Sequence, residues 1–183
     1  KEEGGYEMVA GHRRKFAAAL AGIAEIPCIV RNLTDDEATI VMVDSNLQRE
    51  KILPSEKAFA YKMKLEAMKR QAGRPSKENL RPLDTNLIGT RSDEQLAKNS
   101  PDSARQIQRY IRLTELIPPV LQMVDDGKIA FRPAVELSYL SKEQQKSLYN
   151  TMEREDCTPS LAQAIKMKEF SKDGKRTDEV ILS

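Results

Sequence analysis

A glycine followed by basic residues near the N-terminus has the composition of a phosphate-binding site. Residues 6–10 (YEMVA) alternate apolar and polar side chains, which predicts a β-strand, and Gly11 ends it before a helix. A helix N-terminus presents free backbone N–H groups, and glycine lets a ligand approach the backbone closely. His12, Arg13 and Arg14 add polar side chains there, and arginine forks suit phosphate oxygens. An ordinary strand–helix turn with two exposed arginines would have the same sequence.

Carboxylate and amide oxygens occur together in residues 44–50 (DSNLQRE), at the end of a second predicted helix. Mg²⁺ is usually bound by one or two such groups together with water and substrate phosphates. The carboxylate and amide side chains of this segment are therefore candidate magnesium ligands, and Arg49 could contact phosphate or pair with Glu50. A polar helix end of this kind is also common where no ligand binds.

Residues 92–113 have the pattern of a helix-turn-helix. Leu96 and Ala97 belong to a short predicted helix, residues 99–102 (NSPD) form a tight break, and Ser103 caps a second helix. Arginine side chains suit guanine edges and glutamine side chains suit adenine edges in the major groove. The candidate DNA-binding residues are Lys98, Ser103, Arg105, Gln106, Gln108, Arg109 and Arg112. An αα-hairpin in a helical bundle is the alternative interpretation.

The distribution of charge favours the DNA-binding interpretation. Residues 57–112 contain 13 Lys/Arg and 6 Asp/Glu, a net charge of +7 in a chain whose total is +2. Clustered lysine and arginine attract phosphates and release counterions when they bind a polyanion. A solvated helix surface would also explain a charge cluster considered by itself.

The elements before Pro54 predict a small α/β unit. Residues 26–30 (IPCIV) form a short apolar run that is typical of a buried strand. Thr34 and Glu37 have the spacing of a capping box, which favours a helix although residues 39–43 have β propensity. Pro54 then breaks the chain.

The sequence after Pro54 is helical in character. A helix over 55–69 places Ala58, Tyr61, Leu65 and Met68 on one face, and residues 71–91 read as a long loop or insertion. Capping residues, Pro and Gly predict further helices over 13–20, 93–99, 104–116, 120–125, 142–154 and 160–170. The expected fold is α+β, with a small partial α/β domain over 1–52 followed by a mostly helical domain over 53–183.

The composition excludes several classes of protein. Of 183 residues, 5% are aromatic and none is Trp, which argues against a carbohydrate platform. Two cysteines and one histidine are too few for a disulfide framework or a zinc site. No apolar run approaches the roughly 20 residues that span a bilayer.

Taken in order, these segments resemble the ParB family of chromosome and plasmid partition proteins. Residues 6–18 (YEMVAGHRRKFAA) look like its phosphate motif, Y-E-L-V-A-G-E-R-R-x-x-A-A, and residues 26–31 (IPCIVR) resemble the strand after it. Residues 46–50 (NLQRE) match the end of the second phosphate motif, E-N-L-Q-R-E. Residues 94–98 (EQLAK) match the helix-turn-helix, and residues 126–129 (DGKI) resemble the glycine turn beyond it.

The resemblance implies a sequence-specific DNA-binding clamp that depends on CTP and Mg²⁺. Such proteins bind a palindromic centromere-like site through the helix-turn-helix, and CTP closes the homodimer into a clamp that slides on DNA. By the same resemblance, Asn46 would hold Mg²⁺, and a ParA-type ATPase would bind an arm that precedes Tyr6 in the family. The location would be cytoplasmic, on the nucleoid or a plasmid, with no membrane partner. The triphosphate would be held by Gly11, His12, Arg13, Arg14 and Arg49.

Some positions depart from the family pattern. Ser45 stands where the family has a Glu that is associated with slow CTP hydrolysis, and Asp44 projects about 100° away from it on a helix, so hydrolysis stays open. His12 replaces a usual Glu, and Pro101 a usual turn glycine. The family's N-terminal arm and C-terminal dimerisation domain have no counterpart here, so we expect a truncated core.

Two alternatives to the CTP-dependent clamp follow. The first is a ParB-like transcriptional repressor or nucleoid-occlusion protein with weak or no CTPase activity, which Ser45 motivates. The second is an enzyme of the related sulfiredoxin-like fold that uses the Gly11–Arg14 phosphate site. A cysteine beside His12 is lacking and a helix-turn-helix is attached, and both features disfavour the enzyme.

Overall fold

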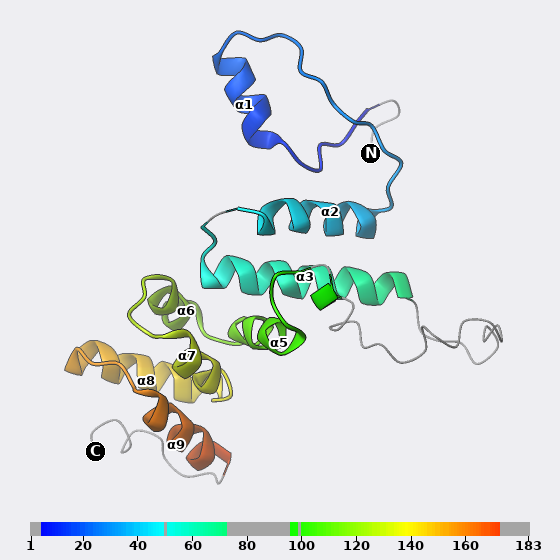
Figure 1. The fold of residues 1–183 in the computed structure, drawn as a ribbon. Coiled ribbons are helices and arrows are strands. Elements are labelled where there is room, and N and C mark those ends of the chain that lie inside the picture. Colours follow the sequence, from blue (N-terminus) through cyan, green and yellow to red (C-terminus); the bar gives the residue numbers. More distant parts are fainter. Residues whose placement is uncertain (1–4, 50, 73–95, 99, 173–183) are drawn as a thin grey trace, which may run out of the picture.

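The computed structural model describes residues 5–49, 51–72, 96–98 and 100–172, in which the regular structure is helical. Residues 96–98 are also helical, and they precede the turn that leads into α5. Within this part of the chain, no helix has the length and apolar character needed to cross a membrane. The helices, labelled in Figure 1, are α1 (His12–Leu20), α2 (Asp35–Leu47), α3 (Pro54–Ala72), α5 (Ala104–Leu113), α6 (Pro118–Asp125), α7 (Phe131–Leu137), α8 (Lys142–Glu155) and α9 (Leu161–Lys172).

The predicted strands over 6–10 and 26–30 are not formed, so the α+β class holds only for its helical part. Both segments are irregular, and no described residue belongs to a strand. A strand is stable only when a neighbour takes up its backbone N–H and C=O groups, and neither segment has such a neighbour here. Their apolar side chains are consequently exposed, Tyr6 by 84% and Ile29 by 82%.

The capping box at the start of α2 is confirmed. The Thr34 hydroxyl accepts a hydrogen bond from the Glu37 backbone N–H at 3.3 Å, and the Glu37 carboxylate accepts one from the Thr34 N–H at 2.8 Å. The Thr34 N–H and hydroxyl both donate to the Glu37 carboxylate, and these two bonds lower the pKa of Glu37. Two satisfied N–H groups and an acidic first turn therefore outweigh the β propensity of residues 39–43.

α3 is the longest described helix, and α2 lies antiparallel along it (Figure 1). Of its predicted apolar face, Ala58, Tyr61 and Leu65 are buried. Two ion pairs join the helices: Asp44 of α2 pairs with the buried Lys64 of α3, and Asp36 lies 2.7 Å from Arg70. α3 thus has one side on α2 and the other on the helices that follow.

The hydrophobic core lies in α3 and the helices that follow it. The smaller of two clusters joins α3 to the helix-turn-helix through Tyr61, Leu65, Leu96 and Ile107. Tyr110 packs against both clusters and connects them. The larger cluster includes Leu113, Val120, Ile129, Leu137, Leu148, Met152 and Met167.

The predicted helices after Pro54 are confirmed where the structure describes them, with small shifts of their ends. The predicted start at 120 moves back to Pro118, because proline is well tolerated in the first turn of a helix. The loop was predicted over 71–91, but Gln71 and Ala72 belong to α3; the rest of it, over 73–91, and residues 93–95 and 99 of the next predicted helix lie outside the described residues. Sequence reasoning missed α7, whose N-cap Ala130 makes no side-chain hydrogen bond and gives no local signal.

Candidate nucleic-acid interface

The turn before α5 and the buried side of α5 place the candidate DNA-reading helix. The Ser103 hydroxyl accepts a hydrogen bond from the Gln106 N–H at 3.3 Å, which caps the helix as predicted. Ile107 and Leu113 are fully buried and hold one side of α5 on the core. The opposite side of α5 carries polar and basic side chains.

Of the seven predicted DNA-binding residues, six are accessible from solvent and one, Arg112, is engaged within the protein. Arg105 and Gln108 are exposed and Arg109 is half-buried; their spacing of three and four residues puts them on one face of α5. Neither Arg105 nor Arg109 forms a hydrogen bond or ion pair with another described residue. Lys98 and Ser103 are also exposed and Gln106 is half-buried, so all six could be reached from solvent.

Arg112 differs from these residues because it is engaged within the protein. Its Nη2 donates to the backbone oxygen of Ser138 at 2.9 Å, and its guanidinium lies 4.2 Å from the centroid of the Tyr139 ring. Lys168 of α9 lies 3.9 Å from the same ring. The buried Nε of Arg112 has no partner among the described residues. Arg112 therefore ties the end of α5 to the end of α7.

A polar cluster under the turn before α5 was not found from the sequence. The Tyr61 hydroxyl donates to Asp102 Oδ2 at 2.5 Å, and Lys57 Nζ lies 2.6 Å from the same oxygen. Burial and the neighbouring Asp102 carboxylate raise the pKa of Tyr61. The sequence placed Tyr61 only on an apolar face, and no local signal pairs it with a residue 41 positions away.

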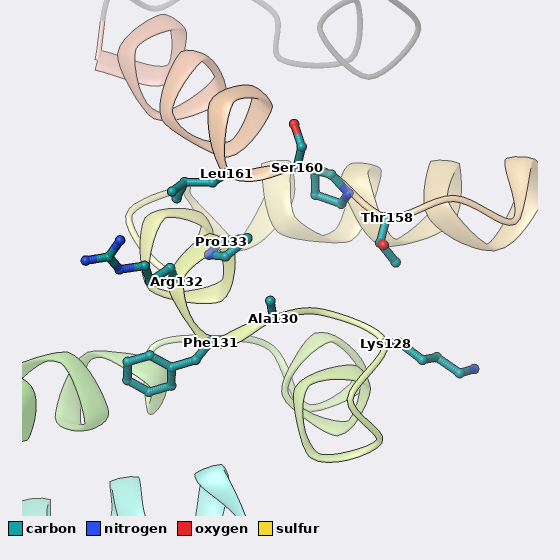
Figure 2. Close-up of a pocket in the computed structure, with 9 residues that line it drawn as sticks. Lys128, Ala130, Phe131, Arg132, Pro133, Thr158, Ser160 and Leu161 are labelled. Atoms are coloured by element: carbon teal, nitrogen blue, oxygen red, sulfur yellow. The ribbon is translucent and has the colours of Figure 1, made fainter.

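A cavity of about 640 Å³ lies beside the interface, between the turn before α7 and the start of α9. Ala130, Pro133, Pro159 and Leu161 give it a largely apolar lining, and Arg132 points away from it (Figure 2). The sequence signals near it are Thr158-Pro159, which predicted a helix start, and the glycine turn over 126–129, which contains the lining residue Lys128.

The predicted phosphate motif is presented on α1. Gly11 precedes the helix with φ of +97°, a conformation that suits glycine, and no side chain caps the helix N-terminus. His12, Arg13 and Arg14 are exposed, and none is bonded to another described side chain. The N–H groups and both guanidinium groups are therefore open to an anion.

The second predicted phosphate segment lies at the C-terminal end of α2. Asn46 and Arg49 are exposed, and Arg49 N–H donates to the Asn46 backbone oxygen at 3.3 Å. No hydrogen bond or ion pair among the described residues joins these side chains to α1, which stands apart from α2 in Figure 1. Asp44 is held by Lys64, and no group of three His, Cys, Asp or Glu side chains converges in the described ranges. The predicted Glu50 partner of Arg49 lies outside them.

Two family models match the chain. The ParB N-terminal domain matches residues 1–47, and the ParB HTH domain matches residues 88–168. The second match contains α5 with Arg105 and Arg109.

Curated relatives agree with these matches. The chain is 32% identical over 141 residues to the chromosome-partitioning protein Spo0J of Thermus thermophilus, which covers 77% of this chain and 44% of the relative. It is 33% identical over 126 residues to the stage 0 sporulation protein J of Bacillus subtilis, covering 69% and 37%. It is 31% identical over 149 residues to the nucleoid occlusion protein of Listeria innocua, covering 81% and 45%. The chain thus spans less than half the length of these relatives.

A solved structure has a similar fold. It is the C-terminally truncated chromosome-partitioning protein ParB from Caulobacter crescentus, complexed to the centromeric parS site. The TM-score is 0.56 at 21% identity, over 91% of this chain and 75% of that one. At this identity the likeness concerns the fold alone.

Proposed function

The chain belongs to the ParB family, and from this premise we propose that it is a sequence-specific DNA-binding protein of the partition class. The observation that carries the proposal is the pair Arg105 and Arg109 on α5. Both arginines lack partners among the described residues, while the other side of the helix is buried. A capped helix that is packed on a core and presents two guanidinium groups without described partners is suited to binding guanine edges in the major groove.

The DNA site that fits this proposal is a centromere-like palindrome. The structural neighbour from Caulobacter crescentus was solved with the centromeric parS site. A palindrome is read by two copies of one chain, so the proposal includes a homodimer that acts as a clamp on DNA. Action as a repressor or nucleoid-occlusion factor is the second candidate, because nucleoid occlusion proteins are among the relatives.

The proposal also includes CTP with Mg²⁺ as the ligand of the N-terminal motif. The unpaired Arg13 and Arg14 and the uncapped start of α1 fit a triphosphate. The exposed Asn46 amide fits a magnesium ion that keeps several waters and is bound mainly through phosphates. Asp44 is engaged by Lys64 and is not needed for this set. Binding of a ParA-type ATPase is part of the same proposal.

Substitution of Arg109 tests the DNA-binding proposal. A cognate duplex is first selected from a random-sequence pool with the wild-type chain, and affinity is then measured for it and for a scrambled duplex. Arg109→Ala should weaken binding to the selected duplex by about 1–3 kcal/mol, because one bidentate contact to a base is lost, and change binding to the scrambled duplex little.

The matched control is Arg154→Ala on α8. Arg154 is exposed and, among the described residues, pairs only with its neighbour Glu155, so its removal should leave both affinities unchanged. A wild-type chain that selects no duplex would refute sequence-specific binding. An equal loss on both duplexes in Arg109→Ala would make Arg109 a phosphate contact instead.

A further inference from the structure

The start of α3 and the turn before α5 share one carboxylate. Asp102 Oδ2 accepts the Tyr61 hydroxyl at 2.5 Å and pairs with Lys57 Nζ at 2.6 Å. Ser100 Oγ lies 2.7 Å from the same hydroxyl and accepts the Asp102 backbone N–H at 3.3 Å. Lys57, Tyr61, Ser100 and Asp102, which we call the turn clamp, therefore bond both ends of a three-residue turn to one helix.

The turn clamp lies in a partly dehydrated environment. The Lys57 and Asp102 side chains are only 20% and 18% exposed, and Tyr61 is fully buried. Charge-assisted hydrogen bonds are short and directional, and they are stronger where water is scarce. Apolar side chains of similar volume would often pack there at no loss of stability. The polar groups thus restrict geometry more than an apolar contact would.

The same two residues of α3 also contact the middle of α5. The Tyr110 ring lies 5.9 Å from the Tyr61 ring, and Lys57 Nζ lies 4.7 Å from its centroid. Asp102 immediately precedes the N-cap Ser103, whereas Tyr110 lies two turns further along the helix. Two separated points of contact on one helix restrict both its position and its rotation.

α3 is itself fixed to the body of the protein at this end. The Ser55 N–H and hydroxyl donate to the two oxygens of the Asp125 carboxylate at 2.9 and 2.5 Å. Asp125 is the last residue of α6, which contributes to the larger core cluster. The turn clamp is therefore attached to a helix that has a second anchor outside α5.

We propose that Lys57 and Tyr61 are positioning residues for DNA recognition, which set the orientation of α5 through Asp102 and Tyr110 without touching DNA. This inference rests on the proposed function, and its ligand is the duplex read by α5. Base contacts depend on side chains held within about 0.5 Å of their productive geometry, whereas contacts to phosphates tolerate larger shifts. The turn clamp accordingly governs discrimination between sequences and leaves general affinity for DNA intact.

Tyr61→Phe is the sharpest test, because it removes one hydroxyl and keeps the buried ring. Affinity for the selected duplex should fall about tenfold, while affinity for the scrambled duplex stays unchanged. Tyr149→Phe is the matched control: Tyr149 is half-buried, its hydroxyl bonds to no described residue, and both affinities should be kept. Lys57→Met should reduce discrimination in the same way, and Lys57→Arg should restore most of it.

A purely structural role gives a different result. Loss of folded protein lowers binding to both duplexes equally, so an unchanged ratio of the two affinities in Tyr61→Phe would overturn the proposal. If the wild-type chain prefers no duplex, the proposed function fails, and amide hydrogen exchange in the full chain then tests the positioning separately. Exchange over Ala104–Leu113 should accelerate in Tyr61→Phe relative to α8, and unchanged exchange there would overturn the inference.

Discussion

The side-chain amide of Gln145 makes three hydrogen bonds to backbone groups outside its own helix. Its oxygen accepts the Ile117 N–H at 2.8 Å, and its nitrogen donates to the oxygens of Glu115 and Leu140 at 3.2 and 3.0 Å. Gln145→Leu removes the partner of the Ile117 N–H and of the Leu140 oxygen, while the Glu115 oxygen still accepts from Lys142 Nζ, so we expect the free energy of unfolding to fall by about 2–4 kcal/mol. Urea denaturation followed by circular dichroism measures it.

Gln122→Leu is the control for this change. Gln122 is exposed, and among the described residues its amide bonds only to Asp126, one turn away. Its replacement should shift stability by no more than about 0.5 kcal/mol. Equal effects of the two substitutions would show that the buried hydrogen bonds of Gln145 contribute nothing specific.

Single residues could be predicted from the sequence where their partners are local. The caps Thr34 and Ser103 bond to groups three residues away, and both were predicted correctly. Arg112 shows the opposite case: its acceptor Ser138 lies 26 positions away, and only the packing of α7 on α5 brings them together. Partners set by tertiary structure leave no trace in local spacing.

At the scale of elements, the ion pair between α2 and α3 is asymmetric. The Lys64 side chain is 5% exposed, whereas that of Asp44 is 41% exposed. Asp44→Ala leaves a buried ammonium group without a partner, so we expect a loss of about 3 kcal/mol of stability. Lys64→Met leaves a carboxylate that water can hydrate, so it should cost much less. Thermal unfolding of both variants tests this order, and the reverse order would contradict the buried placement of Lys64.

A helix could be predicted from the sequence where its capping residues and its apolar face lie within the helix or at its end. Capping boxes and apolar faces identified α2, α3 and α8, because those signals come from residues within one or two turns. Strands depend on partners instead, and residues 6–10 and 26–30 have the right composition without a neighbouring strand. α7 was missed because it starts without a capping side chain and is fixed by the core beneath Ala134 and Leu137.

At the scale of the whole molecule, the two candidate sites differ in how they are supported. The candidate DNA-reading helix, α5, lies on a core that extends from α3 to α9. The candidate nucleotide motif lies on α1, which buries no residue and exposes Phe16 by 68% and Leu20 by 75%. The motif was recognisable from spacing, but the contacts that would bring Asn46 and Arg49 to it are not made here. A ligand that bridges them would supply those contacts.

Because α1 buries no residue, nucleotide binding at its N-terminus should be detectable by limited proteolysis. Lys15 on α1 is exposed and lacks a buried neighbour, so endoproteinase Lys-C should cleave there before any lysine of α6–α8. If CTP with Mg²⁺ binds the motif, cleavage after Lys15 should slow about tenfold at ten times the dissociation constant. ATP, GTP and UTP should protect less, and mass spectrometry of the fragments over time measures the rates.

Arg13→Ala separates protection by binding at the motif from any general effect of nucleotide. It removes a proposed phosphate ligand and leaves the Lys15 cleavage site in place, so CTP protection should disappear while binding to the selected duplex persists. Arg31→Ala, an exposed arginine outside the motif, should keep the protection. Equal protection by all four nucleotides, or protection that survives Arg13→Ala, would contradict a CTP site on α1 and favour the repressor or nucleoid-occlusion alternative.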